Sequence, residues 1–414
     1  MNLFNLRRPA RAVGIETLPE PARARPRIDA KAPDSPVFIR GQGAWLWDDQ
    51  GQACLDFNQG DGVNTLGHSP ESIVKAVANQ AQALINPGVG RSHEGVLALS
   101  DQLCQATGSE RALLFDSAAQ AHEAAIRLAR HWGERHRHSA GHIIVARQGG
   151  EDVYGAPVAS SASHSKTEHA HLSHVPFNDL AALHAAVESR TVAIVLEPLQ
   201  SQGAIVLATA EYLKGAEALC RELGILLILD EARTGMGRCG ALLTETLYGV
   251  QADILALGAG LGGGVPLAAV LVRNSACCAP LAGVPDAQYS NAVTAAAGLA
   301  VLKTVLDAGF LEHVQDTGRH LREGLSRLAG RFGQGQVCGN GLLWTLQLNE
   351  PLARTLERAA LQECLLVGAP QADVLRFSPA LTVTRGNVDE MLLRLSRAFA
   401  RLHAVQASGR KMPA

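Results

Sequence analysis

The segment Ile225-Leu-Leu-Ile-Leu-Asp230 decides the fold class, because an unbroken apolar run ends in an acid. Such a run is typical of a strand that is buried on both faces of a parallel sheet. Ile143–Val145 and Val192–Leu196 have the same character. Tyr212–Leu223, which lies between Val192–Leu196 and the Ile225 run, places its apolar residues on one helical face. Strands that alternate with helices in this way predict a doubly wound α/β domain.

The flanking sequence predicts a second, smaller α+β part. Val37–Phe57 alternates apolar and polar residues around glycines, which is typical of an antiparallel meander. After the short apolar run Ala112–Phe115, a helix is expected over Ala118–Arg130, with Asp116 or Ser117 as its N-cap. Further helices are expected over Ala295–Ala308, Leu311–Arg331 and Val388–Leu402. The predicted organisation is an N-terminal arm (1–36), the N-terminal part of a small domain (37–64), a large α/β domain (65–300), a C-terminal small domain (301–404) and a tail (405–414).

Composition narrows the class of protein. The 414 residues are 47% hydrophobic and 18% charged, which excludes a disordered chain. The formal net charge of -2 argues against a nucleic-acid binder, and no apolar stretch has the length needed to cross a membrane. The eight cysteines form no Cys-x-x-Cys pair, so neither a zinc site nor a disulfide framework is expected. A cytoplasmic protein fits these features best.

Several segments occur in an order that points to one family. They are Arg40–Phe57, Val63–His68, Val175–Asp179, Leu196–Gln200, Leu229–Gly240, Leu261–Pro266 and Leu375–Thr382. Together they resemble the class III aminotransferases, in the acetylornithine and ornithine aminotransferase branch of the pyridoxal-phosphate enzymes. The resemblance implies the fold type I architecture of aspartate aminotransferase, in which a large doubly wound domain with a mixed, mainly parallel sheet accompanies a smaller α+β domain.

The resemblance also implies a catalytic lysine, and this chain departs from the family there. Relatives hold pyridoxal phosphate as a Schiff base on a lysine within Leu-Ala-Lys-Gly-Leu-Gly-Gly-Gly. The matching run here is Leu257-Gly-Ala-Gly-Leu-Gly-Gly-Gly264, so Ala259 stands at the lysine position. A methyl group can neither form the imine nor move a proton.

Other family positions have changed as well. By the resemblance, the cofactor-binding positions are Ser117, Ala118, Ala119, Gly150, Glu151, Asp230, Ala232, Arg233, Ala259 and Ala287. Arg376 matches the arginine that binds the substrate carboxylate, and Gln202 and Arg91 match substrate-side positions. Each retained group has a structural alternative: Asp230 as a hydrogen-bonded structural acid, Arg376 as the partner of an internal acid, and Ser117 as a plain N-cap.

These substitutions predict a pseudoenzyme without a catalytic residue, cofactor or metal, whose cleft holds a small carboxylate, a phosphate or a partner protein. A homodimer, or a heterodimer with a related chain, is expected. Two alternatives remain: a pyridoxal-phosphate-dependent aminotransferase acting on ornithine-type amino donors, and a structural or regulatory partner of an active enzyme. Gly262–Gly264 is expected to form a tight turn, and the histidines of 164–174 are not expected to bind metal.

Overall fold

The Ile225 segment forms the central strand of a seven-stranded sheet in the computed structural model, which describes residues 36–88, 91–138, 140–147, 172–274 and 291–408. The strand order is β4-β12-β11-β10-β7-β5-β6. The strands are β4 (Arg111–Phe115), β5 (His142–Arg147), β6 (Leu172–Pro176), β7 (Thr191–Leu196), β10 (Leu226–Glu231), β11 (Ile254–Leu257) and β12 (Ala268–Val272). All elements named below belong to one compact unit, Phe38–Ala414.

The direction of the strands confirms a mixed, mainly parallel sheet. β10 pairs in parallel with both β7 and β11, and β5 pairs in parallel with β6 and β7. β12 is antiparallel to β11 and to β4, so β4 runs in the same direction as β11. The carboxyl ends of β4, β7, β10 and β11 therefore meet at one edge of the sheet, which is where open α/β sheets bind their ligands.

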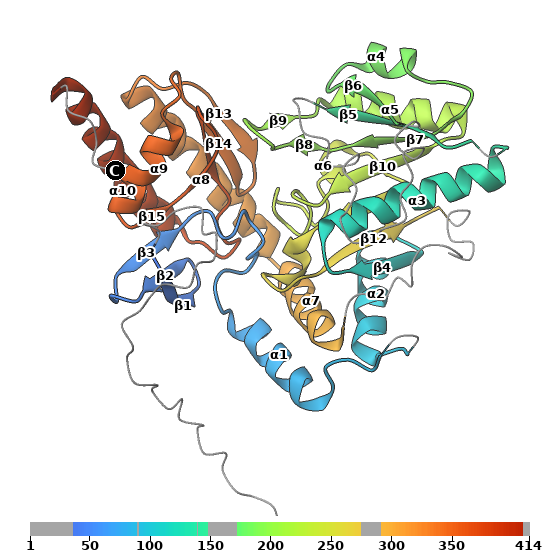
Figure 1. Ribbon diagram of the computed structural model, residues 1–414, viewed down its shortest axis with the longest axis horizontal. Coiled ribbons are helices and arrows are strands. Elements are labelled where there is room, and N and C mark those ends of the chain that lie inside the picture. The colour runs from blue at the N-terminus through green and yellow to red at the C-terminus, as the bar shows by residue number, and fades with distance from the viewer. Residues whose placement is uncertain (1–35, 89–90, 139, 148–171, 275–290, 409–414) are drawn as a thin grey trace, which may run out of the picture. The chain divides into compact units, whose positions relative to one another are not determined.

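Helices cover both faces of this sheet. One face is covered by α3 (Ala118–His136), which contacts β4, β7, β10, β11 and β12 (Figure 1). Ser117 is the N-cap of α3, and it forms a capping box with Gln120. The opposite face packs on α2 (Glu94–Thr107), α5 (Ala210–Leu223) and α7 (Ala292–Val305), with α1 (Glu71–Ala83) against α7. Short elements complete this part: α4 (Leu180–Ala185), β8 (Leu199–Gln200), β9 (Val206–Leu207), α6 (Glu245–Tyr248) and the 3-10 helix η2 (Ala259–Gly262).

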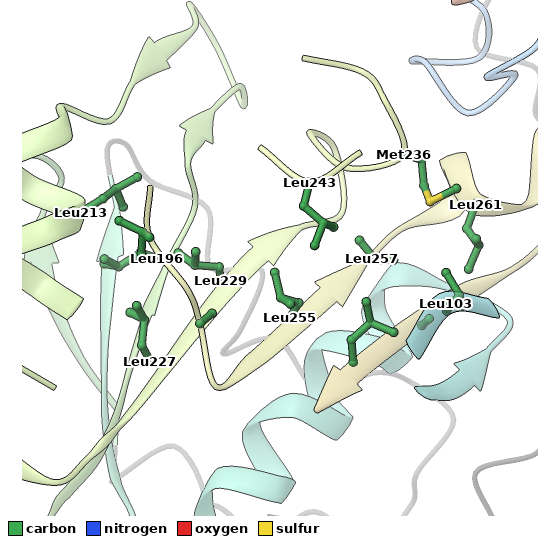
Figure 2. Packing of buried hydrophobic residues seen from close by; sticks show 14 of the residues in the cluster. Leu103, Leu196, Leu213, Leu227, Leu229, Met236, Leu243, Leu255, Leu257 and Leu261 are labelled. Atoms are coloured by element: carbon green, nitrogen blue, oxygen red, sulfur yellow. The ribbon is translucent and has the colours of Figure 1, made fainter. Parts of the chain in front are cut away.

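Leucines from several strands and helices meet in the core beside this sheet. Leu196, Leu227, Leu229, Leu255 and Leu257 project from β7, β10 and β11, and all five are almost fully buried (Figure 2). Burying one such side chain stabilises the folded state by about 1.5–3 kcal/mol. Apolar packing along their length therefore holds β7, β10 and β11 in place.

Two four-stranded sheets form the smaller part. The first has the order β1-β2-β3-β15 and the second β13-β14-β17-β16. Their strands are β1 (Phe38–Gln42), β2 (Trp45–Asp48), β3 (Ala53–Asp56), β13 (Val337–Asn340), β14 (Leu343–Gln347), β15 (Leu365–Leu366), β16 (Gly368–Gln371) and β17 (Val374–Phe377). Around them pack α8 (Phe310–Arg331), α9 (Ala353–Gln362) and α10 (Arg385–Ser408).

Most expected elements are present with shifted ends. The meander over 38–56 is confirmed, and β15 extends it by pairing in parallel with β3. α3 continues to His136, and α10 begins at Arg385 and ends at Ser408. The division into domains at 64/65 and 300/301 stays a prediction. Among the described residues, no single helix is long and apolar enough to cross a membrane; α7 and α8 pass that test only as a pair bent by 74°.

Candidate active site

Four residues of the candidate site lie where strands of the large sheet end, at the carboxyl edge of that sheet. Ser117 follows β4, Glu197 follows β7, Asp230 lies near the end of β10, and Ala259 follows β11. Segments that are far apart in the sequence therefore meet at one edge because their strands are parallel neighbours. The sequence could place each residue after a strand, but only the strand order brings them together.

Asp230 is a buried acid with two identified partners. Its Oδ2 atom lies 2.9 Å from Nε2 of His122 on α3, and each of the two side chains is only 8% exposed. Its Oδ1 atom accepts a hydrogen bond of 2.9 Å from the backbone N–H of Ala232. Burial alone would lower the pKa of His122, but the charge and hydrogen bond of Asp230 raise it above its ordinary value. The pair therefore favours a charged imidazolium beside an ionised carboxylate.

Glu197 brings a second acid to the same edge. Burial raises its pKa to about 8, and the charge of Asp230 acts in the same direction, while Arg233 opposes it. Its Oε1 atom accepts a hydrogen bond of 3.2 Å from Nε2 of Gln200. At neutral pH, Glu197 is therefore mainly a protonated acid, able to donate a proton as well as to accept one.

The N-terminus of α3 lies at this edge as well. The side chain of Gln120 accepts hydrogen bonds of 3.1 Å from the N–H groups of Asp116 and Ser117, and Oγ of Ser117 accepts one of 3.3 Å from the N–H of Gln120. The N-cap role expected for Ser117 is thus confirmed. Among the described residues, no acceptor bonds the N–H groups of Ala118 and Ala119. Helix N-termini with such donors favour anions.

The turn after β11 is held by backbone and hydroxyl contacts. A Cβ atom at Gly258 would lie 2.3 Å from the carbonyl oxygen of Ala232, so only glycine allows the close approach of these two segments. Oγ1 of Thr65 donates a hydrogen bond of 2.6 Å to the carbonyl of Gly260. Gly263 and Gly264 have φ values of 59° and 105°, which confirms the expected tight turn. Ala259 begins η2 between these fixed points.

Arg376 and Arg233 converge on one acid that the sequence analysis did not single out. Asp61 lies 2.6 Å from Nη2 of Arg376 and 2.9 Å from Nη1 of Arg233. We call Asp61, Arg233 and Arg376 the arginine bridge. Burial lowers the pKa of Arg376, Asp61 raises it and Arg233 lowers it. Of the alternatives for Arg376, pairing with an internal acid is what the structure shows; Arg233, expected near a cofactor ring, bonds the same acid.

The other expected site residues lie apart or outside the described residues. Gln202 is exposed and lines a cavity of about 610 Å³ beside β9 and β14, whereas Arg91 is exposed and bonds the carbonyl of Pro87. Gly150, Glu151 and Ala287 lie outside the described residues, as do His164 and its neighbours in the 164–171 stretch. Within the described ranges, no group of three His, Cys, Asp or Glu side chains could hold a metal ion.

Three residues of the candidate site were missed, each for a different reason. His122 stands among alanines in the second turn of α3, and a buried-face histidine was the available signal. Glu197 was quoted only as part of a motif. Asp61 lies in the run Gly60-Asp61-Gly62, which predicts a turn but not the direction of its side chain.

These features define a class of protein. The fold is a doubly wound α/β fold, and the carboxyl edge of its sheet carries a buried acid paired with His122 of α3, the helix whose first N–H groups are unbonded among the described residues. A ligand with a basic ring nitrogen and an anionic group is complementary to such an arrangement.

Comparison with known proteins identifies the family. The model of the aminotransferase class-III family matches residues 29–399. Acetylornithine aminotransferase 2 of Bordetella parapertussis is 37% identical over 375 residues, covering 88% of this chain and 94% of that protein. The acetylornithine aminotransferase of Ralstonia nicotianae is 36% identical, covering 86% and 92%. The chain belongs to the class III aminotransferase family.

Solved structures agree with this assignment. The crystal structure of N-acetylornithine aminotransferase from Stenotrophomonas maltophilia has a TM-score of 0.79 at 30% identity, covering 91% of this chain and 98% of that one. The acetylornithine aminotransferase of Elizabethkingia anophelis gives a TM-score of 0.82 at 26% identity, with 90% and 97% covered. The predicted family and fold type are therefore confirmed.

The same comparisons contradict two predictions. The expected pseudoenzyme, and the expected absence of a cofactor, conflict with relatives that are named as aminotransferases in a pyridoxal-phosphate-dependent family. Both predictions relied on side chains that the family has at the cofactor-binding positions and that this chain lacks. The Asp230–His122 pair and the backbone donors of α3 do not depend on those side chains, and both are present in the structure.

The residues present fit pyridoxal phosphate at two of its groups. Asp230 is a buried acid suited to a protonated ring nitrogen, and the N–H groups of Ala118 and Ala119 suit the phosphate. Burial raises the pKa of Asp116, which disfavours a negative charge next to that anion site. Position 259 offers no amine for a covalent link. The fit is therefore one of noncovalent contacts.

Proposed function

We propose that the protein is a pyridoxal-phosphate-dependent aminotransferase acting on ornithine-type amino donors, and that it holds its cofactor without a covalent link. The observation that carries the proposal is the buried Asp230–His122 pair at the edge of the sheet where α3 begins. Relatives at 34–37% identity named as acetylornithine aminotransferases support the donor class.

Each residue then has a physical role. Pyridoxal phosphate, when bound, supplies an electron sink that makes the Cα proton of an amino acid removable. Asp230, oriented by His122 and the N–H of Ala232, would hold the ring nitrogen in its protonated form. Ala118 and Ala119 would bond the phosphate through their N–H groups. Arg376 would orient the carboxylate of the amino donor.

Proton transfer needs a group other than a lysine in this chain, because Ala259 carries no amine. Glu197 holds a proton at its carboxyl at neutral pH, since burial raises its pKa to about 8. A carboxyl with such a pKa can donate and accept a proton within one reaction cycle. We assign proton transfer in the cleft to Glu197.

The test is a transamination assay on the full chain. Purified protein is incubated with pyridoxal phosphate, N-acetylornithine or ornithine, and a 2-oxo acid acceptor, and the new amino acid is measured by mass spectrometry. Equilibrium dialysis measures cofactor binding separately. Asp230→Asn should lower turnover by about tenfold or more, whereas Asp316→Asn, which removes an equal charge from an exposed pair with Arg319, should leave turnover unchanged. Absence of both turnover and cofactor binding in the unaltered protein would refute the proposal.

We further propose a cytoplasmic dimer, of two copies or with a related chain. Large apolar side chains are exposed on α1, just after it and on α2: Val74 is 52% exposed, Ile85 58% and Leu97 53%. Exposed apolar groups near one another favour a protein interface. The native mass in solution tests this, and Ile85→Glu should shift it towards the monomer. A monomeric unaltered protein would contradict it.

A further inference from the structure

The turn that carries Asp61 has an unusual backbone. Gln59, Gly60, Asp61 and Gly62 have φ values of 48°, 61°, 67° and 88°, so four successive residues are in the left-handed region. The N–H of Gly62 closes the turn with a hydrogen bond of 2.9 Å to the carbonyl of Asn58. Two of the four residues are not glycine, and this conformation costs such residues energy. The turn therefore persists because its surroundings hold it.

Contacts from separate segments fix this turn. Oδ1 of Asp56 accepts hydrogen bonds of 2.8 Å from the N–H groups of Asn58 and Gln59. Nη2 of the buried Arg238 donates a bond of 2.9 Å to the carbonyl of Gly62. Oγ of Ser378, two residues beyond Arg376, donates a bond of 2.9 Å to the carbonyl of Asn58. These hydrogen bonds fix the backbone of the turn, which therefore holds Asp61 next to Arg376.

The contact between Asp61 and Arg376 nevertheless uses only part of the guanidinium. Arg376 donates from Nη1 to the carbonyl of Ser201 at 2.8 Å, and its Nη2 meets Asp61. Its Nε is buried and has no hydrogen-bond partner within the described part of the chain. A guanidinium normally binds a carboxylate through two parallel N–H groups. The buried Nε donor is therefore unsatisfied by the described residues while Asp61 occupies Nη2.

Exposure shows which member of the arginine bridge can move. The side chain of Arg376 is only 10% exposed, whereas Asp61 is 36% and Arg233 43% exposed. Arg376 is fixed by Ser201, but Asp61 and Arg233 can turn towards solvent. If the Asp61 side chain moved away, the charges of both arginines would lose their common partner. Nη2 and Nε of Arg376 and Nη1 of Arg233 would then lack a carboxylate acceptor.

We propose that Asp61 is a built-in competitor for the ligand's carboxylate, and that a carboxylate ligand binds by displacing it from Arg376 and Arg233. The inference rests on the proposed function in one respect, the binding of a substrate carboxylate by Arg376. The ligand class is a small molecule with one or two carboxylates, because the site offers guanidinium groups on two sides. Asp61 is a specificity-determining residue in this arrangement: ligands whose carboxylates interact weakly with the two arginines do not displace it.

The experiment measures binding of glutarate, a dicarboxylate that cannot undergo transamination, to the full chain by calorimetry at fixed ionic strength. Asp61→Asn removes the competing charge and keeps a side chain that tolerates the left-handed backbone. It should bind glutarate about tenfold or more tightly than the unaltered protein, because a charge-assisted contact is made without displacing an internal one. Adding Arg233→Gln to Asp61→Asn should remove most of that gain.

Controls separate the proposal from simpler explanations. Asp316→Asn should leave glutarate affinity unchanged, and thermal melting should show that every variant is folded. Equal or weaker binding by Asp61→Asn, or no binding of glutarate by either protein, would overturn the inference and leave Asp61 as part of a structural ion pair. These measurements need no cofactor and no turnover. Failure here is therefore distinguishable from failure of the transamination assay.

Discussion

The two ends of the candidate site, at Asp230 and at Arg376, are built differently. At the Asp230 end, the acid and its histidine are each 8% exposed, and backbone N–H groups supply the remaining donors. At the Arg376 end, the contacts are ion pairs between side chains, and Asp61 and Arg233 are 36% and 43% exposed. Buried contacts change binding strongly when one partner is removed, whereas exposed charges are screened and can rearrange. Substitutions should therefore have larger effects on catalysis and cofactor binding at the Asp230 end than on ligand binding at the Arg376 end.

The largest effect is expected from Ala259→Lys. It places an amine after β11 at the edge of the sheet that also carries Asp230. A positioned acid or base typically accelerates proton transfer by about 10²–10⁴-fold, so a lysine that acts in addition to Glu197 should raise kcat for transamination by up to that factor. Gln251→Lys, on an exposed position, is the control. An unchanged kcat would show that the Asp230 end does not limit the reaction.

Asp230→Asn should have the next largest effect. Losing a charge-assisted hydrogen bond to the ring nitrogen should weaken pyridoxal phosphate binding by about tenfold or more, as measured by equilibrium dialysis. A second readout needs no cofactor: the pKa of His122, followed by NMR, should fall, because burial lowers it and Asp230 raises it. If the pKa of His122 stays the same, the pair does not determine the charge at this end.

Glu197→Gln tests whether the buried acid at the Asp230 end makes the stability of the protein depend on pH. Burial raises the pKa of Glu197 from 4.5 to about 8, so between these values the folded protein holds a proton that the unfolded chain has lost. The free energy of unfolding should therefore fall as pH rises through this window, by up to about 1.4 kcal/mol per pH unit from this group. Urea unfolding at pH 5 and pH 8 should show a smaller loss for Glu197→Gln. The exposed Glu188→Gln is the matched control, and equal losses in all three proteins would contradict the assignment.

The smallest effect is expected from Ser117→Ala. It removes the N-cap of α3 and should lower the free energy of unfolding by about 1 kcal/mol. Chemical denaturation measures this change. Glutarate binding at the Arg376 end should not change. A matching loss of glutarate affinity would show that the two ends are coupled and would weaken the contrast between them.

Much of the fold was predictable because local sequence determines it. The continuous apolar runs of β7 and β10 can be satisfied only by burial on both faces, and the Ser117–Gln120 capping box marks the start of α3. Helix ends were less predictable: α10 runs past Leu402 to Ser408, and Leu223 is 37% exposed because α5 ends there. End positions depend on tertiary contacts that periodicity does not contain.

The site was predictable only in part. Asp230 and Arg376 were recognised from the resemblance, but the partners His122 and Asp61 come from other elements, α3 and the turn after β3. Weighing substitutions one by one also led to the wrong conclusion about the cofactor. The prediction considered side chains alone, whereas the N–H groups of Ala118 and Ala119 belong to the helix backbone and do not depend on which side chain stands at these positions.

The left-handed turn of Gln59–Gly62 limits how the ligand preference of this cleft can be altered. Gly60 and Gly62 have φ values of 61° and 88°, where almost any other residue would distort the loop, and position 61 accepts little besides aspartate, asparagine and glycine. A random mutagenesis library over these positions would contain mostly misfolded loops. Selection for new acids or amines would instead recover changes at Arg233, whose surroundings allow many more side chains.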